Sequence, residues 1–469
     1  MSRINTNVTS LIAQRVLNRN NNSLSQSLER LGTGLKINSG KDDPAGLIAS
    51  ENLQSETTGI NAAISNAQRA DNIVGTADGG LSEVSSLITQ VQGLVNQAAN
   101  SGGLSAAEVS ANQLQVDSIL STINRVASST SFLGMQLING NYVYTTANVN
   151  ATNFSSVKVN AARLPDNQSV NVDVAVTQSA RTGTVGYTGG ALGAGNPVTI
   201  EIGGNQGTEQ VSFAGGTTVA QMVTAVNALK NATGVSAISS GGDLGLYSTG
   251  FGSDQYVSLT TQSGTFVPTA GKAYGRDATV TVNGAAATAK GLDVSYRSSD
   301  LDLAITLGTA FNTVGNDNFD ITGGGMNFAL ASKVNEGGKA SLGIGSVTTG
   351  SLGDGATGFL NSLASGGANS LSSGNLITAQ KIVDSAVTQV SQLRGRLGAF
   401  QKFTLSSTIN SLGVALENAS AAQSAISDTD FAAETSNLTR SQILSQAAGT
   451  VLAQANSTPQ MALTLLKSA

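Results

Sequence analysis

The longest regular hydrophobic pattern of the chain runs from residue 60 to residue 98. Apolar side chains recur there in steps of three and four, which is the spacing of a coiled-coil helix face. We expect one helix of roughly 60 Å, at about 1.5 Å per residue. Four glycines weaken this helix, so partner helices must hold it. The apolar positions are Ile60, Ala63, Ala67, Ala70, Val74, Ala77, Leu81, Val84, Ile88, Val91, Val95 and Ala98.

A shorter helix is expected at about residues 104–130, after a turn at residues 100–103. Two glycines in that turn suit the left-handed conformation that ends a helix. We place the apolar face of the shorter helix on Leu104, Ala107, Ala111 and Leu114, continued by Ile119, Ile123 and Val126.

The carboxyl-terminal part of the chain carries the same periodicity. Its apolar positions are Ala379, Ile382, Ala386, Val390, Leu393, Leu397 and Phe400, followed by Ile409, Leu412, Leu416 and Ala419. We interpret this helix as the partner of the first one within the same chain. The coiled-coil seam between them is predicted to hold Val84, Ile88, Val91 and Val95 against Leu393, Leu397 and Phe400.

Both ends of the chain carry apolar stripes on helices that are otherwise rich in Asn, Gln and Ser. A polar break at residues 427–430 predicts the N-cap of a last helix, which Pro459 is expected to interrupt. Stripes without a local partner are marginal alone, so we expect these ends to be disordered in the isolated chain and ordered in an assembly. Contacts between subunits are predicted at Leu24, Leu28, Leu31, Leu35, Leu444, Val451 and Leu452.

Between the helical ends, residues from about 141 to 372 are rich in Gly, Thr, Val and Ser. Alternating residues predict a strand at 169–177 and a pair of strands at 198–202 and 210–213. A helix at about 218–232 and strands near 235–239, 244–248 and 256–261 follow, and Asn283-Gly284 predicts a tight hairpin. The fold class is therefore mostly α, a helical coiled-coil bundle made from both chain ends, with an α+β insert of two small units.

The amino-acid composition favours self-association and argues against nucleic-acid binding, catalysis and metal binding. Only 11% of the 469 residues are charged, against about 25% in a typical globular protein. Low charge favours association between copies, and a net charge of −5 argues against nucleic acid as a partner. The chain has no Cys and no His, which removes the usual nucleophile, general base and metal ligands. We expect no catalytic site, no metal and no cofactor.

One string resembles the start of a calcium-binding loop. Asn316, Asn318 and Asp320 have the alternate spacing of its ligands, but the sixth and twelfth positions are Ile321 and Asn327 instead of Gly and Glu. The ligand set does not complete, and no glycine-rich string has phosphate-loop spacing.

The sequence also predicts how the chain is targeted. No basic segment followed by an apolar stretch opens it, and no apolar run of about 18 residues occurs. We therefore expect export without a cleaved signal peptide, and no membrane partner.

Five strings in the helical ends closely resemble bacterial flagellin. The amino-terminal strings are GTGLKINSGKDDPAGLIASENL at 32–53, QVQGLVNQAAN at 90–100 and SFLGMQLING at 131–140. The carboxyl-terminal strings are QLRGRLGAFQ at 392–401 and SDTDFAAETSNLTRSQILSQAAGTVLAQANSTPQMALTLL at 427–466. Residues from about 196 to 264 resemble the small repeat units of some large flagellins. About half of the chain is covered, in the family's order.

The resemblance implies a domain organisation. Residues 1–44 would be an N-terminal inner-core helix, and 45–179 the N-terminal part of a helical core domain with a β-hairpin. Residues 180–340 would form a variable α+β surface domain, 341–430 the C-terminal part of the helical core, and 431–469 a C-terminal inner-core helix.

The resemblance also implies a function: a structural subunit that polymerises with itself into the flagellar filament for swimming motility. The implied location is extracellular, reached by flagellar type III export. Implied partners are the flagellar cap, the hook-junction proteins and an export chaperone on the helix near 431–469. Some flagellins activate an immune receptor through an arginine and a glutamate on the long helix. This chain has Gln90 and Gly93 at those positions, so the receptor motif is altered.

Two other functions stay open at this point. A hook–filament junction protein with related ends would be present in few copies. A surface adhesin would bind a glycan through the aromatic residues of the insert, which are few: Tyr187, Phe213, Tyr247, Phe251 and Tyr256.

Overall fold

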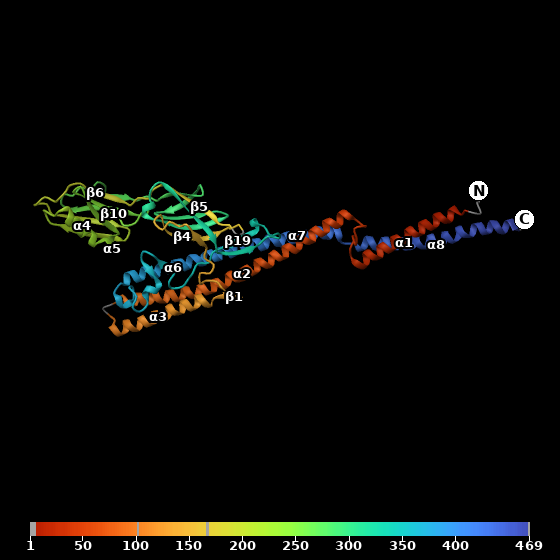
Figure 1. The fold of residues 1–469 in the computed structure, drawn as a ribbon, viewed down its shortest axis with the longest axis horizontal. Coiled ribbons are helices and arrows are strands. Elements are labelled where there is room, and N and C mark those ends of the chain that lie inside the picture. Colours follow the sequence, from red (N-terminus) through yellow and green to blue (C-terminus); the bar gives the residue numbers. More distant parts are fainter. Residues whose placement is uncertain (1–5, 101–102, 166–167, 468–469) are drawn as a thin grey trace. The chain divides into compact units, whose positions relative to one another are not determined.

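A computed structural model of the chain describes residues 6–100, 103–165 and 168–467, and it divides into two compact units. Helical ends flank a β-rich middle part, as the sequence predicts (Figure 1). Each unit combines segments from distant parts of the sequence. The first contains Met1–Arg69, Ala329–Gly338 and Lys402–Ala469, and the second contains Ala70–Phe328 and Lys339–Gln401.

Helices build the first unit. Helix α1 (Val8–Thr33) lies beside α8 (Phe431–Lys467), as Figure 1 shows. Helix α7 (Ser406–Ser427) contacts the first part of α2 (Pro44–Ala98), where Gln423 Nε2 donates to Gln54 Oε1 at 2.6 Å. Asp430 begins α8 as predicted, because its carboxylate accepts hydrogen bonds from the backbone N–H groups of Ala432 and Ala433.

The connections that enter α2 and α8 are tied together. Gly34 ends α1 in the left-handed conformation, with φ of 75°. Leu35 therefore lies outside α1, in an isolated β-bridge with Asp428, and the Lys36 N–H donates to the Ser427 carbonyl at 2.7 Å. The prediction that Leu35 continues the helical stripe is wrong, because the glycine stops the helix before it.

The second unit contains the rest of α2, with α3 (Ala106–Ser129) and α6 (Leu376–Ala399). The single helix predicted around residues 60–98 is confirmed, and all twelve of its apolar positions are buried. On α6 the buried positions include Ala379, Ile382, Ala386, Val390, Leu393 and Leu397.

Helix α3 buries only part of the predicted face: Ile123 is buried as predicted, but Ala107, Ala111 and Leu114 are exposed. Leu114 is 67% exposed, and its buried residues are Asn112, Gln113, Val116, Leu120, Ile123 and Ala127. The reason is a polar contact: Gln113 Nε2 donates to the Leu363 carbonyl at 2.9 Å, and its Oε1 accepts from the Leu371 N–H at 2.8 Å. A glutamine whose polar groups are satisfied by the backbone can be buried, so the apolar pattern alone misplaced the first part of the buried face.

Asp117 strengthens the same junction. Its carboxylate accepts hydrogen bonds from Gln113 Nε2 at 2.9 Å, from the Ser365 N–H at 2.8 Å and from the Ser365 hydroxyl. Burial acts to raise the pKa of Asp117, but these hydrogen bonds outweigh it and hold the pKa below the ordinary value.

A π-helical segment, Phe400–Leu405, joins α6 to α7. Leu397 and Leu405 are both buried and lie eight residues apart, whereas a heptad would place the second position after seven. The wider π turn accommodates the extra residue. The predicted continuation through Ile409, Leu412, Leu416 and Ala419 then lies half-buried on α7.

Eight antiparallel strands form the larger sheet of the β-rich part, in the order β3-β17-β5-β13-β14-β15-β16-β4. Its core includes Phe154, whose ring packs edge-on against Phe311 at 5.5 Å and Phe319 at 5.7 Å. Asn283 and Gly284, at φ of 50° and 79°, turn the predicted hairpin. The strands are β3 (Thr145–Ala147), β4 (Phe154–Ala162), β5 (Val170–Gln178), β13 (Thr279–Val282), β14 (Ala285–Lys290), β15 (Asp293–Arg297), β16 (Leu301–Leu307) and β17 (Gly315–Gly323).

A second hydrophobic core lies between residues 184 and 274, as expected for an insert of two small units. Two sheets, β12-β11-β7-β8 and β6-β10-β9, enclose it with α4. Its elements are β6 (Thr184–Tyr187), β7 (Val198–Gly204), β8 (Gly207–Phe213), α4 (Val219–Ala228), α5 (Lys230–Thr233), β9 (Val235–Ser240), β10 (Asp243–Ser248), β11 (Tyr256–Ser263) and β12 (Lys272–Tyr274).

Short elements complete the structure. They are β1 (Ser131–Phe132), β2 (Met135–Gln136), β18 (Met326–Ala329), β19 (Lys339–Leu342), β20 (Gly353–Asp354) and β21 (Gly358–Phe359), with 3-10 turns at Thr309–Phe311, Glu336–Gly338, Leu360–Leu363 and Leu371–Ser373. The expected boundary at residue 180 falls just after β5, which pairs with β13 and β17 from beyond that boundary.

Candidate assembly interface

The antiparallel contact between α1 and α8 joins segments from the two ends of the chain. Ala13 and Ala448 are buried at this contact, and small side chains let two helices approach closely. Hydrogen bonds cross it as well: Ser10 Oγ donates to Asn456 Oδ1, and Ser445 Oγ donates to Asn21 Oδ1, both at 2.6 Å. Small residues and polar pairs thus contribute to holding the two helices together.

An ion pair lies where α1 ends and α8 begins. Arg30 Nη1 lies 3.7 Å from Glu434 Oε2, and the Glu434 side chain is only 10% exposed. Arg30 is in the last turn of α1 and Glu434 in the first turn of α8. Each charge therefore also complements the dipole of its own helix.

Helix α8 continues through Pro459, so the predicted interruption is wrong. Proline lacks the N–H that would bond to the carbonyl four residues earlier, which here is that of Ala455. Asn7 Nδ2 donates to this carbonyl at 2.7 Å. A side chain near the start of α1 thus replaces the missing backbone donor.

Large apolar side chains remain on the outside of the helix pair. Among the residues predicted to contact other subunits, Leu28 is 52%, Leu444 47% and Val451 57% exposed. Leu24, Leu31 and Leu452 are half-buried, and Leu35 lies in the turn. Sequence reasoning missed further exposed positions, which are Ile12, Val16, Phe431, Ile443 and Met461.

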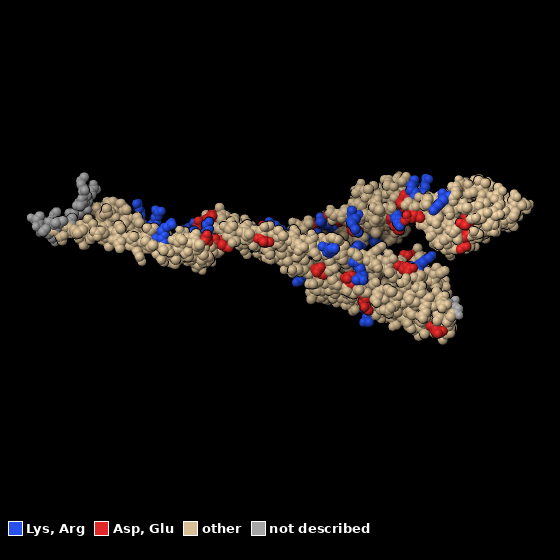
Figure 2. Space-filling model, turned by 180° about the vertical axis from the view of Figure 1, so that it is seen from behind, with Lys and Arg blue, Asp and Glu red and all other residues tan. Residues whose placement is uncertain are grey.

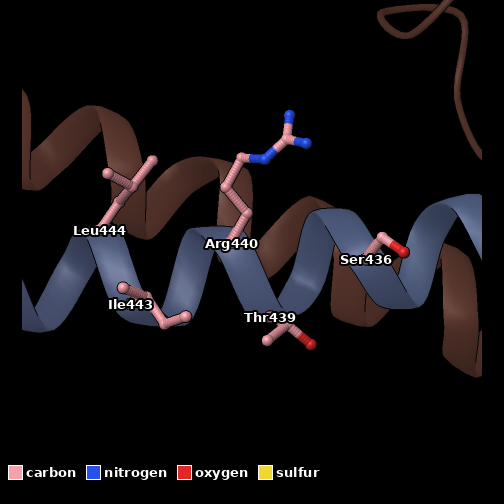
Figure 3. Close-up of a pocket in the computed structure, with 5 residues that line it drawn as sticks. All are labelled: Ser436, Thr439, Arg440, Ile443 and Leu444. Atoms are coloured by element: carbon pink, nitrogen blue, oxygen red, sulfur yellow. The ribbon is translucent and has the colours of Figure 1, made fainter.

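Two hollows mark this apolar surface. A groove of about 370 Å³ runs between α1 and α8, lined by Thr9, Ile12, Ala13, Val16, Asn20, Leu444, Ala447, Ala448 and Val451. A shallower hollow of about 470 Å³ lies along α8, lined by Ser436, Thr439, Arg440, Ile443 and Leu444. Figure 3 shows Arg440 and Leu444 on the same side of α8, one turn apart. Leu444 lines both hollows, so the apolar surface is continuous.

Charged groups are sparse on α8, whereas α1 carries Arg15, Arg19, Glu29 and Arg30. No Asp, Glu, Lys or Arg occurs in the sequence from 441 to 466. The space-filling view shows mostly uncharged surface over the terminal helices (Figure 2). A surface with few charges and many half-exposed apolar side chains is typical of an interaction site.

The predicted seam residues lie in the second unit. Val84, Ile88, Val91 and Val95 of α2 and Leu393 and Leu397 of α6 are buried. Phe400 is half-buried, with its ring 6.0 Å from that of Phe328. Polar pairs that the apolar pattern does not report also link α2 and α6. Arg394 Nε donates to Asp78 Oδ1 and Gln92 Nε2 donates to Asp384 Oδ1, both at 2.9 Å.

Comparison with known proteins agrees with this organisation. The bacterial flagellin N-terminal helical region matches residues 4–143, and the C-terminal helical region matches 380–466. The flagellin hook IN motif matches 199–250. The B-type flagellin of Pseudomonas aeruginosa is 30% identical to this chain, and the match covers 99% of each chain. The chain belongs to the flagellin family. Flagellin D of Vibrio anguillarum is 29% identical over 467 residues, again 99% of each chain.

Solved structures similar to this flagellin include hook-associated protein 3 of Legionella pneumophila. It is 13% identical and covers 79% of this chain and 97% of its own, with a TM-score of 0.31. FliC of Burkholderia pseudomallei is 18% identical and covers 71% of this chain and 98% of its own, with a TM-score of 0.23. Superpositions this loose add nothing to the argument.

The two positions that the sequence resemblance connects with receptor activation lie on the surface. Gln90 and Gly93 are both exposed on α2. A Cβ atom added at Gly93 would meet no other atom within 4 Å. The position can thus accept a side chain without a clash.

The described residues also bear on metals and membranes. The calcium-like string lies on strand β17, and the Asp320 carboxylate accepts from Asn148 Nδ2 at 2.7 Å and Asn171 Nδ2 at 2.8 Å. Within the described ranges, no group of three or more Asp or Glu side chains could hold a metal ion. None of the helices in those ranges combines the length and apolar character needed to cross a bilayer.

Proposed function

We propose that this flagellin polymerises with copies of itself into the flagellar filament, where its role is structural and needs no catalytic residue. The relatives named flagellin match it over 99% of both chains, which supports a filament subunit over a hook–filament junction protein. The observation that carries the mechanism is the apolar, weakly charged outer surface of the α1–α8 pair. This surface lies within the two family-matched helical regions.

The proposed assembly surface is built from the outward side chains of the helix pair. Complete burial of one large apolar side chain stabilises by about 1.5–3 kcal/mol, so each half-exposed Leu or Val offers about half of that. Each contact between subunits would bury several such side chains. Because the contact is repeated along the filament, these small free energies add up to a stable polymer. Leu24, Leu28, Leu31, Leu35, Leu444, Val451 and Leu452 form the proposed contact set, with Ile12, Val16 and Ile443 added from their exposure.

The second unit has a different proposed role. Its seam of Val84, Ile88, Val91 and Val95 against Leu393, Leu397 and Phe400 would keep the helical core of each subunit rigid. Burial of these side chains stabilises the fold of the core. Polymerisation and folding of the subunit are thereby assigned to separate sets of side chains.

Export and the remaining partners follow from the same surface. An apolar helix such as α8 needs protection before assembly, and we propose that an export chaperone covers the helix near 431–469 in the cell. The chain then leaves by type III export without a cleaved signal peptide. It would meet the hook-junction proteins and the cap at the growing end of an extracellular filament.

Seeded polymerisation tests the proposal. Purified full-length chain is mixed with short filament fragments, and growth is followed by sedimentation and electron microscopy. We expect filaments that lengthen from the seeds, while a chain ending at Asp430, which lacks α8, adds none. Full-length protein that stays monomeric at high concentration in the presence of seeds would refute the filament assignment.

A further inference from the structure

The single proline inside α8 creates a specific defect in that helix. Pro459 has no N–H, so the Ala455 carbonyl loses its helical donor. A polar backbone group without a partner is costly when water cannot reach it. The defect occurs at one position in α8 and therefore marks one point along its length.

The side-chain amide of Asn7 connects this freed carbonyl to the start of α1. Its Oδ1 accepts from the Ser10 N–H at 3.0 Å and so caps α1. Its Nδ2 donates to the Ala455 carbonyl at 2.7 Å. The start of α1 is thus fixed against one carbonyl of α8, which lies 448 residues away in sequence.

Where α1 ends and α8 begins, the Arg30–Glu434 ion pair and the Lys36 N–H bond to the Ser427 carbonyl also restrict the stagger. Further along the pair, Ser445 bonds to Asn21, but Asn18 lies about one turn earlier on α1 and could offer a similar group after a slip. A slip of one helical turn moves the partners by about 5.4 Å. No second proline in α8 supplies another freed carbonyl, so the contact of Asn7 is lost at every other stagger.

We propose that Asn7 is a register lock: its Nδ2 group and the Ala455 carbonyl freed by Pro459 set the stagger of α1 against α8. The proposal rests on the filament role, because the stagger decides where the outward apolar side chains of the two helices lie relative to one another. Asn7 is a positioning residue: it acts on assembly through the α1–α8 pair of its own subunit.

The first test removes the donor and keeps the cap. Asp accepts hydrogen bonds and caps a helix but cannot donate, so Asn7→Asp isolates the contact with Ala455. We expect it to raise the critical concentration for seeded polymerisation roughly tenfold, the equivalent of about one hydrogen bond. Asn22→Asp, the same change at an exposed site on α1, is the matched control and should have little effect.

The second test restores the missing N–H. Pro459→Ala gives the Ala455 carbonyl a backbone donor within α8, so Asn7→Asp should cost less than twofold in that background. An equal cost of Asn7→Asp with and without Pro459 would overturn the lock, and so would no cost in the parent chain.

A third readout measures the stagger directly and does not require polymerisation. The chain has no Cys, so engineered pairs report without background. Asn21→Cys is combined with Ser445→Cys, or with Gly449→Cys one turn further on, because a disulfide needs Cα atoms within about 7 Å. We expect disulfide formation to be at least about tenfold faster for the first pair and this preference to fall in Asn7→Asp. An unchanged preference would overturn the lock, whereas a parent chain that never polymerises would overturn the filament role.

Discussion

Leu28→Asp should block assembly of this flagellin without unfolding the subunit. The Leu28 side chain is 52% exposed on α1. Substitutions at such surface positions usually change the free energy of unfolding by less than about 0.5 kcal/mol. The helical core of the second unit should therefore melt at its normal temperature, which circular dichroism measures.

The cost in the filament is larger. Burying the remaining half of a Leu side chain contributes about 1 kcal/mol, which Asp forfeits. Removing a carboxylate from water adds at least about 2 kcal/mol. A total near 3 kcal/mol corresponds to a rise of more than about 100-fold in critical concentration. Leu28→Ala, which loses only the apolar part, should raise it about fivefold.

Sedimentation of seeded reactions over a range of protein concentrations gives the critical concentrations. Val314→Asp is the control, because Val314 is 75% exposed and lies in the β-rich part. It places the same charge on an exposed apolar position outside the proposed surface and should polymerise normally. Normal filaments from Leu28→Asp, or equal defects in the two Asp variants, would contradict the assignment of this surface.

Four further predictions concern the folded subunit. Ile88→Ala removes a fully buried side chain and should lower the free energy of unfolding by about 2–5 kcal/mol in urea titrations. Gly79→Ala should stabilise by up to about 1 kcal/mol, because a Cβ there meets no atom within 4 Å. Gly80→Ala should destabilise in the same assay, because its Cβ would lie 2.5 Å from Thr130 Oγ1. The pKa of Asp117 is lowered in the fold, so its stabilisation is present above the unfolded pKa and is lost as pH falls through the folded one. Acid unfolding below about pH 4 should be steeper in the parent than in Asp117→Asn.

The helices and strands were largely predictable because their periodicities report burial directly. The steps of three and four between Ile60 and Ala98 correctly predicted α2. The dipeptide Asn283-Gly284 correctly predicted the hairpin between β13 and β14. The extra residue of the π segment is visible as the spacing from Leu397 to Leu405, although the pattern alone does not say how the helix absorbs it.

Two of the failures share one physical cause, which is compensation by a distant polar group, whereas Leu35 lies outside α1 because the adjacent Gly34 ends the helix. Gln113 takes a buried position on α3 because backbone groups 250 and 258 residues away satisfy it. Pro459 stays inside α8 because Asn7 supplies a donor from the opposite end of the chain. Neither partner can be identified from local pattern. The outward face of the terminal pair was only partly predicted, because small and polar residues occupy the contact at Ala13, Ala448 and Ser10 and leave several large apolar side chains exposed.

The pairing of α1 with α8 can form only after nearly the whole chain has been synthesised on the ribosome. Helix α1 ends at Thr33 and α8 begins at Phe431, so about 400 residues separate the two. At about 5–20 residues per second, translation takes roughly 20 to 80 seconds to cover that distance. Throughout this interval α8 is not yet available to α1, and a nascent subunit cannot present the complete apolar surface of the α1–α8 pair. The order of these segments in the chain therefore limits association through this surface during synthesis.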